Sequence, residues 1–439
     1  MPHTHLVGLI DRLEMASLTV RVRSRGDLAA LEEQVHSQSD QPLAQRRYLS
    51  HEEFEQQYGA DPADIELVEQ FAQEHGLTAV RRSLGERSIT LNGRLGDLVD
   101  AFHADVQMVR HSSGISRARQ GEISVPEHLQ GIVTGVFGFD TRPKFRGKHQ
   151  HTLQAEATPG GQYGVAATDY AKRYNFPTEF EGVALDGTGQ TIALVELGGG
   201  FQRSDLATYF QEINVPLPNI VAVSVNGVQN SPTTPNPYDI EVMLDIEVVG
   251  AVAPGAMIAV YFAPNGEQGL LDAISTVVHD TKRKPSVLSI SWGEPEDNLD
   301  QHNLSAFHEV FMTAATMGIT VCVASSDHGT ATLAASDWDD KIHVHHPAGD
   351  DLVLACGGTQ IEDGVDVVWN DGTPFSSKGG GWASGGGISK RFPVPAYQTD
   401  AALPVSLVPG KPGRGVPDIA MSAVAPLMAA LVALLNQAK

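Results

Sequence analysis

The stretch Glu241-Val-Met-Leu-Asp-Ile-Glu-Val-Val-Gly250 has a helical pattern, and it runs by way of Ala253-Pro-Gly255 into the strand-like Met257-Ile-Ala-Val-Tyr-Phe262. Other strand-like runs occur at 191–195, 287–291 and 319–324, with turns or amphipathic segments between them. Short apolar strands alternating with helices are typical of a parallel sheet buried on both faces. The sequence therefore predicts an α/β fold around a parallel sheet.

Two carboxylates, Glu241 and Asp245, interrupt the apolar residues of this helical stretch. Residues four apart share a helix face, and the neighbours Met243, Leu244 and Ile246 favour burial. Carboxylates are rarely buried without a partner or a function, and two held close together cannot both ionise freely. The pattern indicates either a buried catalytic pair or, as the alternative, a helix with a solvated acidic edge.

Polar and aromatic residues follow three of the predicted strands. Glu196 comes directly after 191–195, Trp292 after 287–291, and Asp327 three residues after 319–324. In open parallel sheets, ligands and catalytic groups gather outside the carboxyl ends of the strands. We therefore expect one edge of the sheet to carry all three side chains.

Ser422 precedes an apolar segment that continues through residues 428–435. The backbone N–H of a serine at the head of a buried helix points outward, beside the positive end of the helix dipole. This geometry suits a nucleophile, because the same N–H can bind an oxyanion. The alternative is an ordinary N-cap serine.

The residues before about 150 form a separate pattern. Residues 18–23 alternate like a half-buried strand, and 88–91 predict another. Ser50-His-Glu-Glu53 is a capping box, and Asp61-Pro-Ala-Asp64 combines an N-cap with a proline in the first turn. A small α+β unit is therefore expected, followed by a polar, glycine-terminated segment at 145–161 that we predict to be an exposed linker open to proteolysis.

The composition limits the possible partners. The net charge of −23 argues against nucleic acid and anionic membranes, which require basic patches. No transmembrane span and no ordinary signal peptide are recognisable in the sequence. Cys322 and Cys356 lie in apolar runs and predict small buried core residues rather than a disulfide framework or a zinc site.

Together these motifs resemble the sedolisins, a family of serine-carboxyl peptidases. The resemblance covers most of the chain from about residue 163 onward, on the segments Thr191-Ile-Ala-Leu-Val-Glu-Leu-Gly-Gly-Gly200, Glu241–Gly250, Ala253-Pro-Gly-Ala256, Ser289-Ile-Ser-Trp-Gly293, Leu354-Ala-Cys-Gly-Gly-Thr359, Gly413-Arg-Gly-Val-Pro-Asp418 and Ser422-Ala-Val-Ala-Pro-Leu427. It implies a subtilisin-like α/β sandwich at 163–439, truncated at its C-terminus. An α+β activation propeptide at 1–147 and a processing linker at 148–162 would precede it.

The resemblance also implies roles for individual residues. Ser422 would be the nucleophile and Glu241 its general base and acid. Asp245 would orient Glu241, and Asp327 would be the acid of the oxyanion hole.

Glu196 and Trp292 would be the outer members of the hydrogen-bond chain behind these groups. A carboxylate base suits acid conditions, because glutamate titrates near about 4.3 whereas histidine is already protonated well below its usual pKa of about 6.5. The resemblance thus implies an enzyme that hydrolyses peptide bonds fastest in acid.

The chain departs from the family pattern before and after Ser422. In the family a long segment separates the Val-Pro-Asp motif from the nucleophile, whereas here Ile419-Ala-Met421 alone joins Asp418 to Ser422, with Met421 where threonine is expected. The family continues past the serine helix into a calcium-binding loop, but this chain ends at Lys439. We therefore expect no calcium site and no other cofactor.

The resulting prediction is a monomeric endopeptidase made as a zymogen. It would act on proteins and peptides, form an acyl-enzyme and be inhibited by its own propeptide, and the family implies an extracellular location. The alternative is a catalytically silent or fragmentary homologue that acts as a binding or self-inhibited module. A glycosidase that uses Glu241 and Asp245 is a weaker interpretation, because it leaves Ser422 without a role.

Overall fold

The computed structural model describes residues 5–39, 41–111, 114–147, 166–233, 237–331, 341–372, 382–403 and 412–439. The chain forms two compact units. The smaller comprises residues 1–144, 264–281 and 301–318, and the larger comprises 145–263, 282–300 and 319–439.

An eight-stranded sheet organises the larger unit, in the order β12-β13-β11-β14-β16-β18-β19, with β22 also paired to β18. All of its pairs are parallel except that between β18 and β19. The strands are β11 (Thr191–Glu196), β12 (Asn219–Ser224), β13 (Met257–Phe262), β14 (Val287–Ile290), β16 (Thr320–Ala324), β18 (Leu354–Glu362), β19 (Val365–Val368) and β22 (Ile419–Met421). The predicted parallel sheet is confirmed, including the four strands named from the sequence.

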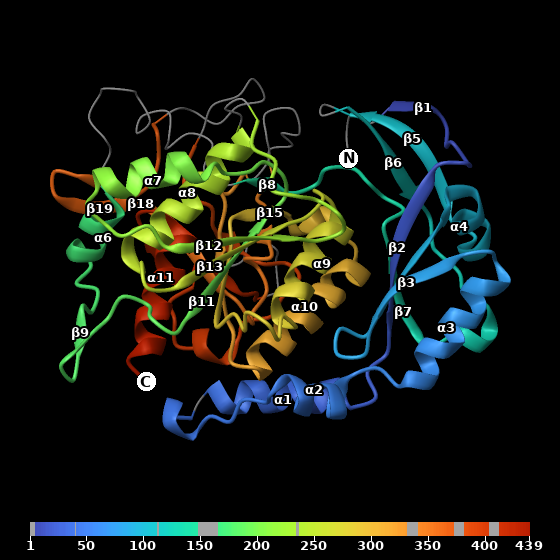
Figure 1. The fold of residues 1–439 in the computed structure, drawn as a ribbon, viewed down its shortest axis with the longest axis horizontal. Helices are drawn as coiled ribbons and strands as arrows, with labels where there is room; N and C mark the ends of the chain where they lie inside the picture. Colours follow the sequence, from blue (N-terminus) through green and yellow to red (C-terminus); the bar gives the residue numbers. More distant parts are fainter. Residues whose placement is uncertain are drawn as a thin grey trace. The chain divides into compact units, whose positions relative to one another are not determined.

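Helices α8 (Pro237–Val252) and α11 (Val424–Gln437) pack against each other and against the sheet (Figure 1). Helices α6 (Ala167–Arg173) and α7 (Arg203–Glu212) pack in turn on α8. The core between helices and strands includes Cys322 and Cys356, both fully buried as predicted. Each large aliphatic side chain buried in such a core contributes roughly 1.5–3 kcal/mol.

Short strands complete the larger unit. A three-stranded sheet has the order β17-β15-β8, where β15 is Trp292–Pro295, β17 is His345–His346 and β8 is Arg146–Gly147. Two further strand pairs are β9 (Glu179–Phe180) with β10 (Val183–Ala184) and β20 (Gly387–Ile388) with β21 (Gly415–Val416). Short 3-10 turns lie at Glu296–Asn298 and Ala396–Gln398. Phe145 is buried and β8 is paired, so the exposed linker predicted from residue 145 is wrong for 145–147; its remainder, 148–161, lies outside the described residues.

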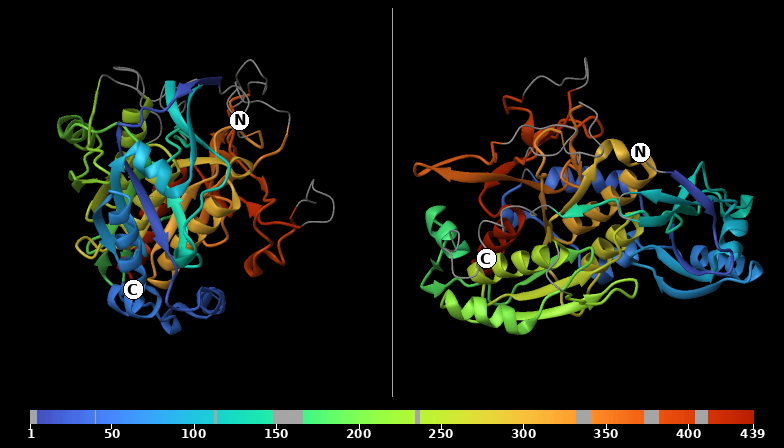
Figure 2. Two further views of the ribbon diagram at one scale, coloured as in Figure 1. Left: turned by 90° about the vertical axis from the view of Figure 1, so that its right-hand side faces the viewer. Right: turned by 90° about the horizontal axis from the view of Figure 1, so that it is seen from above.

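The smaller unit has two antiparallel sheets, one in the order β3-β4-β2-β7 and one in the order β1-β5-β6. Figure 2 shows its N-terminal strands and helices, in blue to cyan, from two further sides. Its strands are β1 (His5–Leu9), β2 (Met15–Val22), β3 (Thr78–Ser83), β4 (Ser88–Arg94), β5 (Asp105–His111), β6 (Gly114–Gln120) and β7 (Val133–Phe137). Its helices are α1 (Leu28–Ser39), α2 (His51–Tyr58), α3 (Pro62–Glu74) and α4 (Leu95–Phe102), with 3-10 turns at Leu43–Gln45 and Glu127–Leu129. The predicted capping box of α2 and the Asp61 cap of α3 are both present.

Two helices from later in the chain belong to this smaller unit: α9 (Glu267–Val278) and α10 (Gln301–Thr316). Acidic residues on them meet partners from the first 144 residues. Thr19 Oγ1 donates to Asp272 Oδ2 at 2.8 Å, and Arg87 Nη2 donates to Glu309 Oε2 at 2.8 Å. Since both pairs are largely buried, they tie the N-terminal α+β fold to helices that are encoded more than 200 residues later.

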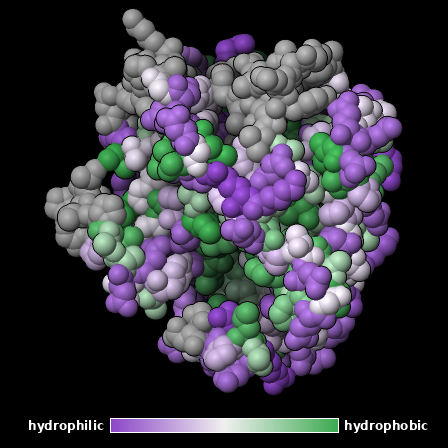
Figure 3. All heavy atoms as spheres, turned by 90° about the vertical axis from the view of Figure 1, so that its left-hand side faces the viewer, coloured by the Kyte–Doolittle hydropathy of each residue, from purple (hydrophilic) through white to green (hydrophobic). Residues whose placement is uncertain are grey.

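On the face drawn in Figure 3, hydrophobic patches lie between hydrophilic ones. In the larger unit the exposed apolar side chains include Phe180 and Val183 of the β9–β10 pair and Val365 and Val368 of β19. Among the described residues, no helix combines the length and hydropathy needed to cross a membrane.

Candidate active site

The two carboxylates of α8 are buried. Glu241 is 2% exposed and Asp245 is 0% exposed. The alternative of a solvated acidic edge is therefore wrong. A buried carboxylate requires hydrogen bonds or protonation to offset its lost hydration.

Asp245 receives its partner from the end of strand β14. Ser291 Oγ lies 2.9 Å from Asp245 Oδ2 and 3.1 Å from Oδ1, within hydrogen-bond distance of both. Burial raises the pKa of Asp245 to about 7. Below that pH the carboxyl is neutral and can itself donate a hydrogen bond.

Glu196, at the end of β11, is paired with the indole of Trp292, whose Nε1 donates to Glu196 Oε2 at 3.1 Å. Burial, followed by the nearby charge of Asp245, raises the pKa of Glu196 well above its ordinary value. Like charges held this close cannot both ionise, so the two carboxyls titrate as a pair. The ends of β11 and β14 thus bring Glu196 and Trp292 beside Asp245 of α8.

A short peptide strand passes beside Glu241. In the antiparallel pairing of β8 with β15, Gly147 lies opposite Trp292 and Arg146 opposite Gly293. A Cβ added to Gly147 would lie 3.2 Å from Glu241 Oε2 and 3.4 Å from Trp292 Cη2. Only a residue without a side chain fits there without displacing its neighbours.

Tyr238, in the first turn of α8, adds an aromatic wall to this site. Its ring stacks on Trp292 with centroids 5.8 Å apart and an interplanar angle of 12°. Offset stacking of this kind adds about 0.5–1.5 kcal/mol to the burial of the two rings. The sequence did not single out Tyr238, although it lies three residues before Glu241 and hence on nearly the same helix face.

Asp327 lies on the loop after β16, buried and held by the main chain. The N–H of Ala383 donates to the Asp327 carbonyl at 2.9 Å, and the N–H of Gly385 donates to the Ser326 carbonyl at 2.7 Å. A Cβ on Gly385 would lie 2.3 Å from Ser326 Cβ, so glycine is required at this close approach. The main chain of Asp327 is thereby fixed just past the carboxyl end of β16, at the sheet edge where the sequence placed it.

Ser422 directly follows β22 and is 4% exposed. Its N–H donates to Tyr174 Oη at 3.1 Å, and its Oγ lies 3.3 Å from Tyr174 Oη and 3.3 Å from Thr359 Oγ1. Ser422 Oγ also donates to the Thr359 carbonyl at 3.2 Å. Within the described part of the chain the hydrogen bonds of Ser422 go to Tyr174 and Thr359, and none goes to Glu241.

The turn between β22 and α11 is strained. Ala423 has φ of +56° and Val424 has φ of +39°, and a β-branched residue rarely adopts this left-handed region. Ala423 is the N-cap of α11 and Ser422 precedes it, so the interpretation of Ser422 as an N-cap serine is wrong. The strain lies where only three residues, Ile419–Met421, separate Asp418 from Ser422.

A buried ion pair anchors the approach to Ser422. Arg414 is fully buried, and its Nη1 and Nη2 donate to the two carboxylate oxygens of Asp418 at 2.9 and 2.8 Å. Asp418 also accepts the N–H of Ala355 at 2.7 Å. The Val-Pro-Asp segment is thereby fixed to β18, the strand that carries Thr359.

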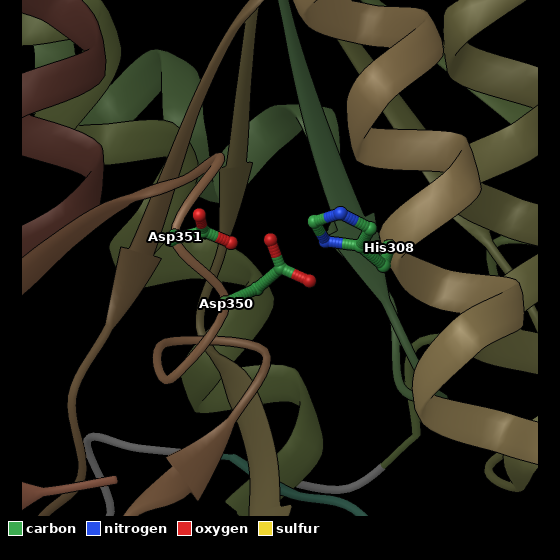
Figure 4. Close-up of side chains that lie close together, drawn as sticks. All are labelled: His308, Asp350 and Asp351. Carbon is green, nitrogen blue, oxygen red and sulfur yellow. The ribbon is translucent and has the colours of Figure 1, made fainter. Parts of the chain in front are cut away.

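Two acidic residues outside this group, Asp350 and Asp351, lie in the loop between β17 and β18, and Figure 4 shows their side chains. Asp350 is fully buried and accepts the N–H of Leu352 at 3.0 Å. This hydrogen bond gives Asp350 a structural role in the loop. The sequence did not mark either residue, because a pair of loop aspartates has no distinguishing pattern.

Comparison with known proteins places these groups in context. The family model of the pro-kumamolisin activation domain matches residues 2–142. Kumamolisin of Bacillus sp. (strain MN-32) is 40% identical over 466 aligned residues, which cover 98% of this chain and 82% of kumamolisin. Tripeptidyl-peptidase 1 of Homo sapiens is 25% identical, over 94% of this chain and 74% of that protein.

Among solved structures, the Pseudomonas sedolisin, a serine-carboxyl proteinase complexed with pseudo-iodotyrostatin, matches with a TM-score of 0.52 and 25% identity. The match covers 64% of this chain and 82% of that one. It confirms the predicted fold class for the larger unit. The aligned length of 466 for kumamolisin exceeds the 439 residues of this chain, so kumamolisin has residues without a counterpart here.

Proposed function

Because the chain belongs to the sedolisin family of serine-carboxyl peptidases and carries the family's propeptide, we propose that it is an acid-acting endopeptidase made as a zymogen. The observation that carries the proposal is the group of buried carboxyls at Glu241, Asp245 and Glu196, beside a peptide strand that passes Glu241. Burial raises the pKa of Asp245 and Glu196, and such a cluster of buried carboxyls beside a peptide strand suits proton transfer in acid.

In the proposed reaction, Ser422 Oγ attacks the peptide carbonyl carbon and Glu241 accepts its proton. The protonated Asp327 carboxyl donates a hydrogen bond to the resulting oxyanion, an interaction typically worth about 3–4 kcal/mol. Glu241 then returns the proton to the leaving amine as the C–N bond breaks, which leaves an acyl-enzyme on Ser422. Water hydrolyses this ester with Glu241 again acting as the base.

The raised pKa of Asp245 supports this assignment of roles. At acidic pH Asp245 is neutral, since its pKa is raised to about 7 by burial. A neutral carboxyl one turn away removes the like-charge repulsion that would otherwise oppose ionisation of Glu241. Glu241 can therefore act as a base in acid, while Ser291 and the neutral Asp245 hold each other in place.

The proposal is tested by incubating the purified full chain at about pH 4 with a denatured protein. We expect substrate cleavage together with self-cleavage within residues 145–161, both found by mass spectrometry. Because Ser422 is the proposed nucleophile, the Ser422→Ala protein should cleave neither the substrate nor itself. Absence of both reactions in the unaltered protein would sink the enzyme proposal.

The strand at Arg146–Gly147 leads to a prediction about self-inhibition. Replacing Gly147 by leucine should expel this strand from its place beside Glu241 and Trp292, since even a Cβ would meet Glu241 Oε2 at 3.2 Å. We expect a several-fold increase in the initial rate at which a short peptide is cleaved before processing occurs. Gly8→Leu is the matched control, because a Cβ there meets nothing within 4 Å.

An unchanged initial rate in Gly147→Leu would show that the strand does not limit access to Glu241. The comparison is made on freshly diluted protein, with the fraction of intact chain followed by gel electrophoresis. Faster processing of the chain itself would also be expected, because the same strand must leave the site before another peptide can enter.

One observation favours a second candidate function, a catalytically silent or self-inhibited homologue. Ser422 is bonded to Tyr174 and Thr359 rather than to a base. A protein fixed in this state would bind peptides beside Glu241 without cleaving them. Peptide binding by isothermal titration calorimetry without any product would support this candidate over the enzyme.

A further inference from the structure

The hydroxyl of Tyr174 lies against the group that a serine peptidase uses to bind its oxyanion. Tyr174 follows directly after α6, and its Oη accepts the N–H of Ser422 at 3.1 Å. The same oxygen lies 3.3 Å from Ser422 Oγ. Both polar atoms of Ser422 that would act on a substrate are therefore in contact with one phenol oxygen.

This position matters because of what a substrate needs there. An oxyanion-hole donor must lie about 2.7–3.1 Å from the oxygen that becomes negatively charged. A peptide carbonyl approaching Ser422 Oγ would place its oxygen near the Ser422 N–H, where Tyr174 Oη now lies. Substrate and Tyr174 Oη therefore compete for one hydrogen-bond donor.

Two charged residues hold Tyr174 in this place. Its hydroxyl donates to Asp366 Oδ1 at 2.7 Å, while Arg173 Nε and Nη2 donate to Asp366 Oδ2 at 2.9 and 2.7 Å. The hydrogen bonds from Arg173, followed by that from Tyr174, lower the pKa of Asp366. The Asp366 anchor therefore keeps its charge further into the acidic range than an ordinary carboxylate.

The remaining contacts of Ser422 hold it without activating it. Its Oγ donates to the main-chain carbonyl of Thr359 at 3.2 Å and lies 3.3 Å from the Thr359 hydroxyl. Neither an amide carbonyl nor a hydroxyl is basic enough to take the serine proton near pH 4. The hydrogen bonds present thus fix the side chain in an unreactive arrangement.

We propose that the hydroxyl of Tyr174, held by Asp366, blocks the Ser422 N–H and must be displaced by the carbonyl oxygen of a substrate. We call this side chain the Tyr174 plug. The proposal rests on the proposed function, because it takes Ser422 as the nucleophile. It assigns to the N-terminal part of the larger unit an inhibitory role separate from that of the propeptide. It also accounts for a half-buried tyrosine whose hydroxyl bonds Asp366 and Ser422 at once.

The test measures how fast Ser422 reacts with a small fluorophosphonate, followed by intact mass spectrometry at a fixed acidic pH. Tyr174→Phe keeps the ring but removes the hydroxyl, and we expect labelling to be about tenfold faster, the effect of losing one or two ordinary hydrogen bonds. Tyr174→Ala should react at least as fast. Ser422→Ala should not be labelled, and Tyr209→Phe on α7 is the control for loss of a tyrosine hydroxyl elsewhere.

Labelling of a folded Tyr174→Phe protein at the unaltered rate, or more slowly, would overturn the plug. Folding is checked by thermal unfolding, and Asp366→Asn, which weakens the anchor without touching the ring, should shift labelling in the same direction. Cleavage assays on the same variants separate the two ideas. If cleavage requires Ser422 but its rate does not depend on Tyr174, the plug proposal is wrong and the peptidase proposal stands. If the Tyr174 variants are labelled faster but no variant cleaves a substrate, the peptidase proposal is wrong and the plug proposal stands.

Discussion

Replacing Glu241 by glutamine is expected to lower kcat for peptide cleavage by about 10²–10⁴-fold, the usual contribution of a general base. Glutamine keeps the size and hydrogen-bonding shape of the side chain but cannot accept the Ser422 proton. Because Glu241 is 2% exposed within α8, the substitution also relieves the burial of a charge. We therefore expect the loss of activity to occur without loss of thermal stability.

The matched control for this prediction is Glu247→Gln. Glu247 lies on the same helix, and burial raises its pKa to about 8, so it too is a glutamate in an apolar environment. No role in the proposed reaction depends on it. Equal losses of activity in the two variants would attribute the effect to α8 packing and contradict the role of Glu241 as base.

A double substitution sharpens the same prediction. Ser422→Ala alone should reduce kcat to the residual level left by binding and oxyanion stabilisation, and adding Glu241→Gln should reduce it no further. Residues that act as one unit show such non-additive effects. Independent, multiplicative losses would mean that Glu241 serves a step in which Ser422 takes no part.

The sequence offered the buried carboxylate pair as one of two interpretations, the other being a solvated acidic edge, for a reason that is local. Met243, Leu244 and Ile246 surround Glu241 and Asp245 with apolar side chains, so any helix that buries these residues also carries the acids inward. The ends of β11, β14 and β16 were equally readable, because parallel strands expose their carboxyl ends at one sheet edge. Local pattern and fold rules were sufficient for this half of the candidate site.

The surroundings of Ser422 could not be predicted in the same way. Its partners Tyr174 and Thr359 lie 248 and 63 positions away in the chain, and their approach depends on the register of β22 on β18. Ser291 was also missed as the partner of Asp245, since a serine at a strand end has many ordinary roles. Phe145 was placed in a linker because its neighbours are polar, yet the fold buries it.

These differences divide the candidate site into two parts. Glu241, Asp245, Glu196 and Trp292 form a group built around α8 and the strand ends, whereas Ser422 is bonded in a second group with Tyr174 and Thr359. The strained turn at Ala423 and Val424 lies at the second group. The proposed reaction therefore requires Ser422 to exchange its present hydrogen bonds for one to Glu241.

The interaction of the first 144 residues with α9 and α10 is expected to weaken steeply as the pH falls, through His279. This histidine caps the C-terminus of α9. Its ring lies 5.9 Å from that of Phe54 and 6.4 Å from that of His51. Burial, followed by the charges of His51, Arg21, Arg87 and Arg81, lowers the pKa of His279 to about 3.

The direction of the effect follows from this lowered pKa. Above pH 6.5 His279 is neutral whether or not the N-terminal residues cover it, so it does not weaken their binding to α9 and α10. Below pH 6.5 an uncovered His279 takes up a proton, whereas the covered one stays neutral down to about pH 3. The free energy that favours the covered state over the uncovered one therefore falls by about 1.4 kcal/mol per pH unit, or roughly 2 kcal/mol between pH 6.5 and pH 5.

The measurement uses chain cleaved in the linker, so that the N-terminal fragment can leave. Its dissociation constant, followed by size-exclusion or by fluorescence of a labelled fragment, should rise about tenfold per pH unit from pH 6.5 to pH 5. This window lies above the usual pKa of carboxylates, so titration of ordinary carboxylates contributes little to the slope. His279→Gln should flatten the dependence, while His128→Gln, at an exposed histidine, should leave it unchanged.

A His279→Gln protein that still releases the fragment with the full pH dependence would assign the effect to other groups. The same slope in both proteins below pH 5 would not decide the question, because ordinary carboxylates begin to take up protons there. Restricting the comparison to pH 5–6.5 excludes ordinary carboxylates, and the His279→Gln variant separates His279 from the other histidines, whose usual pKa of about 6.5 also lies in this range. Within that window the prediction requires that one buried imidazole alone makes the propeptide leave as the solution becomes acidic.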